Sequence, residues 1–145
     1  MDYYELNPIT MRQLVRHPYI RIALLDNDET PNCWNILQHA KRQIDLIRDE
    51  YGNTVCVFKI GITADPAYRF HWYRRENFEP MTLIHVSSSH HLTGMLESAL
   101  IQSYNGIRGC RNIHLGGDGS MHRSPPPYYA YIVAARADRG IPIGS

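Results

Sequence analysis

The sequence lacks the features that mark membrane-spanning, secreted and zinc-stabilised proteins. It has no run of eighteen apolar residues, so we expect no membrane-spanning helix. The first ten residues have neither a basic head nor an apolar core, so we expect no signal peptide. Cys33, Cys56 and Cys110 are too few and too scattered for a disulfide framework, and no CxxC pair indicates a structural zinc site. These absences favour a reducing compartment, the cytoplasm or the nucleus.

The charge on the chain is small but unevenly distributed. The formal net charge is +1 over 145 residues, with −2 on residues 1–54 and +3 on residues 55–145. Groups that bind phosphate are therefore expected in the second part, although an excess of this size does not by itself establish a nucleic-acid partner. The length and the hydrophobic content of 43% are typical of one globular domain, so we expect residues 1–145 to form a single domain.

Residues 55–73 are the most informative stretch of the chain. The apolar, β-branched and aromatic run at residues 55–58 predicts a buried strand. We expect Gly61 to form a corner after this strand, where a backbone or a phosphate can approach closely. Asp65 followed by Pro66 predicts the start of a helix, because a carboxylate caps the helix and proline suits its first position.

Arg69 and Tyr73 are four residues apart on this predicted helix and therefore share a face. An arginine beside a phenol, just beyond a glycine corner, is suited to binding a phosphate. The simpler alternative is that the helix packs its aromatic residues into the core and leaves Arg69 on the surface.

The remaining hydrophobic patterns predict an α+β domain. Strands are expected at residues 19–25, 81–87 and 128–135, and helices at residues 11–16 (capped by Thr10), 34–50 (capped by Asn32) and 94–105 (capped by Thr93). Three prolines at residues 125–127 form a stiff spacer before the last strand. The histidines at positions 90, 91, 114 and 122 have no established metal-ligand spacing.

Taken in order, four features resemble the GIY-YIG nuclease superfamily in its KIG-type branch. They are the run Lys59-Ile60-Gly61-Ile62-Thr63, Arg69 with Tyr73, Glu97 within LESALI, and Asn112 ahead of the GGDG turn at residues 116–119. The resemblance implies a small, mainly antiparallel three-stranded sheet flanked by helices. Here the core motifs would span residues 55–119, with the helix at residues 34–50 inserted. Residues 120–145 would add a proline-rich spacer and an extra C-terminal strand.

The resemblance also implies an endonuclease that hydrolyses phosphodiester bonds, most simply those of DNA, with the help of a divalent metal ion. Arg69 would hold the scissile phosphate, Glu97 would be the protein ligand of Mg²⁺ or Mn²⁺, and Asn112 would organise the site. A hard cation of this kind often binds only one or two carboxylates and completes its shell with water. Tyrosines from the first two strands would assist the attack of water.

Two departures from the family pattern concern these tyrosines. Lys59 occupies the position of the YIG tyrosine, where it can bind phosphate or assist proton transfer. No GIY triplet lies upstream. Tyr19 is the first candidate for the missing phenol. The second is the strand containing Tyr128, Tyr129 and Tyr131, which resembles a first strand placed at the other end of the chain. The sequence leaves both open.

The remaining candidate residues are those that would contact the substrate. They are Gly61, Thr63, Arg74, Arg75, Arg108 and Arg111, together with Lys59 and Arg69. A catalytically inactive domain that binds nucleic acid or another partner is the alternative function, and the absent GIY triplet favours it. For either function, sequence specificity would come from the inserted helix, the basic second part, a second copy of the chain or a partner protein.

Overall fold

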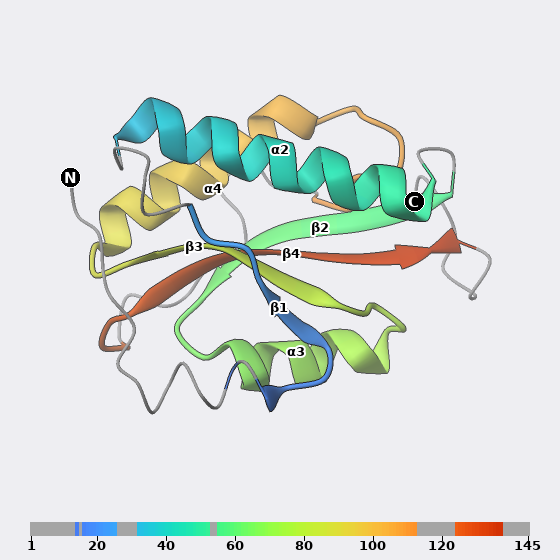
Figure 1. Cartoon of the computed structure of the whole chain (residues 1–145), viewed down its shortest axis with the longest axis horizontal. Coiled ribbons are helices and arrows are strands. Elements are labelled where there is room, and N and C mark those ends of the chain that lie inside the picture. The colour runs from blue at the N-terminus through green and yellow to red at the C-terminus, as the bar shows by residue number, and fades with distance from the viewer. Residues whose placement is uncertain (1–13, 15, 26–31, 53–54, 113–123, 138–145) are drawn as a thin grey trace.

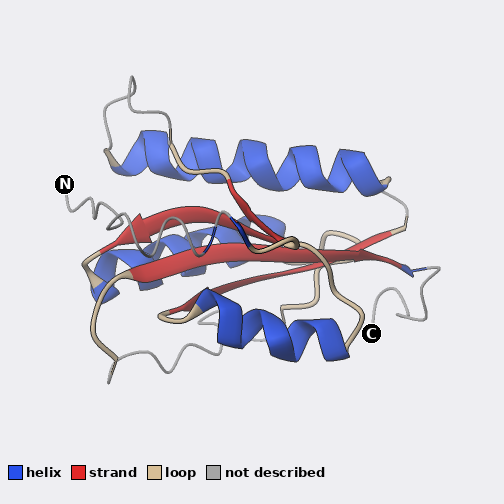
Figure 2. Cartoon of the chain, turned by 60° about the horizontal axis from the view of Figure 1, so that its bottom comes forward, coloured by secondary structure: helices blue, strands red, loops and turns tan. Residues whose placement is uncertain are grey.

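The computed structural model describes residue 14 and residues 16–25, 32–52, 55–112 and 124–137. These residues form an α+β fold in which a four-stranded mixed sheet has helices on both faces (Figure 1). The strands are β1 (Ile20–Ile22), β2 (Cys56–Thr63), β3 (Met81–Ser87) and β4 (Tyr128–Arg136), and the helices are α2 (Cys33–Tyr51), α3 (Pro66–Arg75) and α4 (His90–Tyr104). Helices α2 and α4 cover one face and α3 covers the other, as Figures 1 and 2 show.

The strand order is β1-β3-β4-β2, so the C-terminal strand β4 lies inside the sheet. It pairs antiparallel with both β2 and β3, while β1 pairs parallel with β3. The expectation of a three-stranded antiparallel sheet with an added C-terminal strand is therefore wrong in its detail. The physical reason is that β4 is buried on both faces along nearly its whole length. Such a strand belongs between two neighbours rather than at an edge.

Two of the three helices α2, α3 and α4 begin at the cap residue that the sequence predicts. Asn32 caps α2 and Asp65 caps α3, each accepting a hydrogen bond from the backbone N–H three residues on, at 2.8 Å and 3.1 Å. The third helix, α4, begins at His90 and not near residue 94, because Ser89 is its cap. Thr93 lies inside the helix, where its hydroxyl donates to the carbonyl of Ser89 at 2.8 Å. Most of the short helix expected at residues 11–16, with Thr10, lies outside the described residues.

An apolar core lies on each face of the sheet. The residues of β2 and β4 alternate between them, as strand geometry requires. On the α2 and α4 face, the core includes Ile36, Ala40, Ile44, Phe58, Ile60, Leu100, Ile101 and Ile132. On the α3 face, it includes Val57, Phe70, Tyr73, Met81, Leu83, Tyr129, Tyr131 and Val133. The side of β4 that carries Tyr129 and Tyr131 therefore faces α3.

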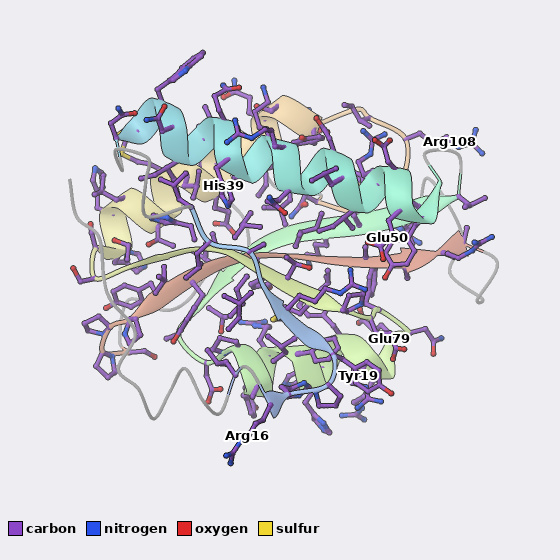
Figure 3. All side chains as sticks on the ribbon, in the orientation of Figure 1. Arg16, Tyr19, His39, Glu50, Glu79 and Arg108 are labelled. Carbon is purple, nitrogen blue, oxygen red and sulfur yellow. The ribbon has the colours of Figure 1, made fainter. Side chains whose placement is uncertain are left out.

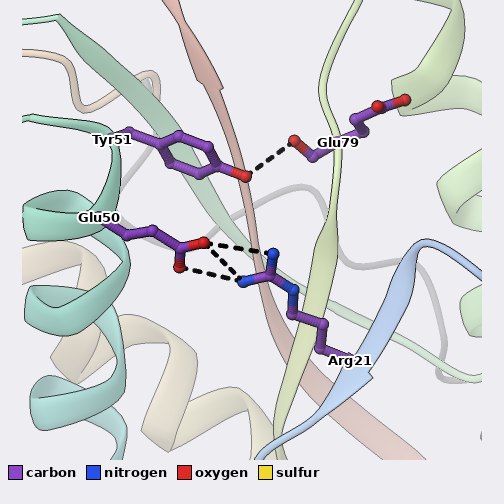
Figure 4. Close-up of polar contacts among 4 residues, drawn as sticks. All are labelled: Arg21, Glu50, Tyr51 and Glu79. Atoms are coloured by element: carbon purple, nitrogen blue, oxygen red, sulfur yellow. Dashed lines mark hydrogen bonds and ion pairs between the residues drawn. The ribbon is translucent and has the colours of Figure 1, made fainter.

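The C-terminal end of α2 contacts the side of the sheet formed by β1 and β3. Arg21 of β1 forms an ion pair with Glu50 at 3.0 Å, and the hydroxyl of Tyr51 donates to the carbonyl of Glu79 at 3.2 Å (Figure 4). Both charged side chains are about half exposed, so the ion pair adds little stability. No helix in the described part of the chain is long and apolar enough to cross a membrane.

Candidate active site

The centre of the candidate site is Tyr131, whose phenol lies across Gly61. The two residues are partners in the register of β2 and β4. A Cβ atom on Gly61 would overlap the hydroxyl and the ring of Tyr131. Gly61 is not among the glycines with positive φ, so it is needed here for space and not for an unusual backbone conformation. The expected corner is therefore wrong: β2 continues through Gly61 to Thr63.

The hydroxyl of Tyr131 lies 2.7 Å from the hydroxyl of Tyr73 on α3, within hydrogen-bond distance. The two rings meet edge to face, with centroids 5.7 Å apart. The ammonium group of Lys59 lies 5.9 Å from the centroid of the Tyr73 ring. Lys59 and Gly61 are two apart on β2 and so point to the same face. Lys59, Gly61, Tyr73 and Tyr131 thus gather between the sheet and α3.

Arg69 and Glu97 both act electrostatically on the Tyr131 hydroxyl. Burial is the main reason that the pKa of Tyr131 is raised well above its usual value, and the neighbouring Tyr73 raises it further. The positive charge of Arg69 lowers this pKa and the negative charge of Glu97 raises it. Both predicted catalytic charges therefore lie close enough to Tyr131 to influence its proton.

Two adjoining hollows contain Arg69 and Glu97. Arg69 lines a hollow of about 170 Å³ with Thr63 and Tyr68. Glu97 lines a larger one of about 520 Å³, which also includes His90 and His91. Ile62, next to the end of β2, lines both. Glu97 belongs to α4 and Arg69 to α3, so the two hollows are lined from opposite faces of the sheet.

Glu97 is only 1% exposed, so it is not a solvated surface charge. A glutamate is rarely buried without a structural or functional reason. Its carboxylate fits a hard divalent cation, because such a cation accepts one carboxylate and completes its shell with water, for which the larger hollow has room. Among the described residues, no group of three or more histidine, cysteine, aspartate or glutamate side chains is placed to hold a metal ion. His114 and His122 lie outside those residues.

Asn112 holds the outer edge of β2 in place. Its side-chain oxygen accepts from the backbone N–H of Ile60 at 2.8 Å, and its side-chain nitrogen donates to the carbonyl of Ile60 at 2.7 Å. Just before it, the carbonyl of Gly109 and the N–H of Arg111 bond the backbone of Phe58 at 2.9 Å and 2.8 Å. The segment therefore continues the sheet along β2, and the amide of Asn112 stands in for one more backbone pair. It positions Ile60, directly before Gly61.

Tyr19 is not brought to this site. It lies just before β1, at the sheet edge opposite β2. The guanidinium of Arg74 lies over its ring at 4.5 Å and also approaches the carboxylate of Glu79 at 4.0 Å. Figure 3 shows Tyr19 and Glu79 on the α3 side and Arg108 on the opposite side of the sheet. The phenol that lies beside Gly61 is that of Tyr131, a residue of the second alternative.

The predicted basic residues do not form one cluster. Arg69 lines its hollow, whereas the guanidinium of Arg75 lies 5.6 Å from the ring centroid of exposed Trp72. Arg108 is exposed in the loop after α4. Thr63 has a local role as well, since its hydroxyl accepts from the N–H of Asp65 at 3.0 Å and shapes the start of α3.

Tyr68 was missed by the sequence reasoning, although it lines the hollow of Arg69. The signal was available, because Tyr68 is two positions before the apolar Phe70 and therefore lies about 200° around the helix from it, on the outer face. Comparison of the chain with family models, curated proteins and solved structures gave no match.

Proposed function

We propose that the chain is a divalent-metal-dependent endonuclease of GIY-YIG type, acting on DNA, in which the C-terminal strand β4 supplies the phenol that the N-terminal side lacks. The observation that supports this most is the environment of one hydroxyl group. The hydroxyl of Tyr131 is hydrogen-bonded to that of Tyr73 and lies over Gly61. The charges of Arg69 and Glu97 both shift its pKa. A phenol, an arginine and a glutamate are the residue types that the resemblance implies for phosphodiester hydrolysis, although the phenol comes from β4 and not from one of the first two strands.

Arg69 is suited to binding the scissile phosphate. Its side chain is half-buried at the wall of a hollow, and a guanidinium offers paired donors to phosphate oxygens. A fixed cation in this position stabilises the negative charge that develops on the phosphate during cleavage. Lys59, on the same face of β2 as Gly61, adds a second positive charge on the α3 side of the sheet.

Tyr131 and Tyr73 are the residues proposed to transfer protons during cleavage. Because the pKa of Tyr131 is raised, its hydroxyl keeps its proton at neutral pH and first acts as a hydrogen-bond donor. Tyr73 lies at hydrogen-bond distance, so the pair can act as a relay in which one phenol takes up a proton from the attacking water while the other releases its own to the leaving oxygen. Glu97 would hold the divalent cation, which supplies Lewis acidity and lowers the pKa of bound water.

An inactive nucleic-acid-binding domain is the second candidate, and one observation favours it. Tyr131 is only 2% exposed, and burial disfavours its ionised form, so very little of the phenolate that could act as a base is present at neutral pH. Under this alternative the phenol pair stabilises the core and Arg69 binds phosphate without cleavage.

A nuclease assay separates the two candidates. Single-stranded, duplex and branched DNA are incubated with the protein, with and without Mg²⁺ or Mn²⁺. Arg69→Ala should slow cleavage by about two to three orders of magnitude, because it removes a preorganised donor. Glu97→Gln should abolish the metal-dependent reaction. Arg42→Ala, which removes an exposed arginine from α2 on the other face, is the matched control and should cut normally. If the wild-type protein cuts none of the substrates with either ion, the inactive-domain candidate replaces the nuclease.

A further inference from the structure

A ridge of exposed aromatic and basic side chains runs along the outer face of α3. It consists of Tyr68, Trp72 and Arg75, which we call the α3 ridge. Tyr68 and Trp72 are 62% and 52% exposed, although large aromatic side chains usually bury most of their surface. At 100° per residue, these three positions fall within a sector of about 60° on the helix. The rings therefore form one continuous surface with the guanidinium of Arg75 at its far end.

The ridge begins at the candidate active site. Tyr68 lines the same hollow as Arg69, and Trp72 lies one turn further along the helix. A strand whose phosphate is held at Arg69 would therefore place its neighbouring nucleotides against the ridge. Continuity with the phosphate position is the first reason to expect nucleic acid here.

The charge of α3 is the second reason. The helix, PAYRFHWYRR, contains three arginines and no aspartate or glutamate. Arg75 already lies over the face of Trp72, with 5.6 Å between the guanidinium carbon and the ring centroid. Alternating aromatic rings and cations suit a ligand that has flat bases and a negatively charged backbone. Arg74 approaches the carboxylate of Glu79 at 4.0 Å, but a purely apolar partner on the ridge would bury the guanidinium of Arg75 without adding a negative charge to offset it.

The exposed rings decide which form of DNA fits. Each base has a flat face that stacks on an aromatic side chain, but in a duplex these faces are already covered by neighbouring base pairs. Tyr68 and Trp72 are separated by about 6 Å along the helix axis, so each ring can meet its own base. We propose that the α3 ridge stacks unpaired bases, and that the substrate is a DNA strand unpaired next to the scissile phosphate. This inference rests on the proposed function.

Tryptophan fluorescence tests the stacking directly, because the chain has only two tryptophans. Trp34 is 68% exposed on α2, on the other face, and provides the matched control. Trp34→Phe leaves Trp72 as the reporter, and Trp72→Phe leaves Trp34. Titration with oligo(dT) should quench the fluorescence of the Trp34→Phe protein and leave that of the Trp72→Phe protein unchanged. An abasic oligomer of the same length should quench neither.

Affinity measurements on alanine variants complete the test. Trp72→Ala and Tyr68→Ala should each weaken oligo(dT) binding by about 5- to 100-fold, whereas Trp34→Ala should not change it. Binding of the abasic oligomer should be nearly the same in all four proteins. Circular dichroism checks that each variant is folded. If one of the two ridge variants fails to fold, the other still measures the contribution of the ridge to oligo(dT) affinity.

Several results would overturn the inference. Equal affinity of wild type, Trp72→Ala and Tyr68→Ala for oligo(dT) would do so, as would sedimentation at dimer mass with Trp72 shielded by the second copy. Failure of the proposed function is a separate result. If oligo(dT) quenches Trp72 but no divalent ion supports cleavage, the stacking of bases on the α3 ridge is supported and the proposed nuclease activity is wrong. If DNA is cut but the ridge variants bind normally, the nuclease stands and the ridge is wrong.

Discussion

Replacing Gly61 with alanine should destabilise the protein through a single contact. The added Cβ would overlap the hydroxyl and ring of Tyr131, which faces Gly61 across the β2–β4 pairing. The backbone at Gly61 is not in the left-handed region, so alanine adopts it without strain. The whole effect therefore comes from the displaced phenol.

The size of this effect follows from two contributions. Forcing extra volume into a packed site costs about 1–3 kcal/mol. If the Tyr131 ring moves away, its hydrogen bond to Tyr73 is lost as well, at a cost of about 1 kcal/mol. We expect Gly61→Ala to lower the free energy of unfolding by about 2–4 kcal/mol, a large part of a typical domain stability.

Urea denaturation of four proteins tests this reasoning. The set comprises wild type, Gly61→Ala, Tyr131→Val, and the double variant. Valine removes the ring but keeps a side chain suited to a strand. In the Tyr131→Val background, Gly61→Ala should cost almost nothing, because the clash has gone. Gly94→Ala in α4 is the control for glycine replacement: no atom lies within 4 Å of its added Cβ, so it should stabilise by about 0.5–1 kcal/mol. Equal costs of Gly61→Ala in both Tyr131 backgrounds would refute the reasoning.

Two further predictions concern the surroundings of this contact. Asn112→Ala removes both side-chain hydrogen bonds to Ile60, so the free energy of unfolding measured in urea should fall by about 1–3 kcal/mol; an unchanged value would mean that the outer edge of β2 does not depend on this amide. Stability should also decline above pH 10, because the raised pKa of Tyr131 keeps its phenol protonated in the folded chain, while the unfolded chain loses that proton and so binds fewer protons. Burial and a hydrogen bond to Asp45 raise the pKa of Tyr104 as well, so Tyr131→Phe should make the alkaline decline in melting temperature shallower without abolishing it.

Local patterns predicted the individual elements well. β3 has the bounds that its β-branched run indicates, and α3 begins where Asp65 and Pro66 place it. These features depend on residues a few positions apart, and short-range chemistry determines them. The prediction that Thr93 caps the helix was wrong, because Ser89, four residues earlier, also has a hydroxyl group. That hydroxyl accepts from the N–H of Leu92 and caps the helix at its start.

Contacts between distant parts of the chain were harder to predict. The proximity of Arg69 and Tyr73 follows from one helical turn, but the pairing of Gly61 with Tyr131 joins strands that are far apart in the sequence. No local rule decides whether β4 lies in the centre of the sheet or at its edge. Tyr19 was therefore placed ahead of Tyr131 as a candidate, although β1 pairs parallel with β3 on the far side of the sheet.

Asn112 shows the same limit in another form. Its place before a glycine-rich turn is compatible with an ordinary turn residue, and the sequence resemblance alone suggested a role in the site. The structure adds the physical reason, because its amide matches the backbone of Ile60 at both positions and extends the edge of the sheet.

The most direct test of the account compares Tyr131→Phe with Tyr19→Phe in single-turnover DNA cleavage with Mg²⁺. Each variant removes one hydroxyl and keeps the ring. The account predicts that Tyr131→Phe slows cleavage by about 100-fold or more, since it removes a positioned proton-transfer group, while Tyr19→Phe cuts at the wild-type rate. A wild-type rate in Tyr131→Phe, or a loss confined to Tyr19→Phe, would contradict it.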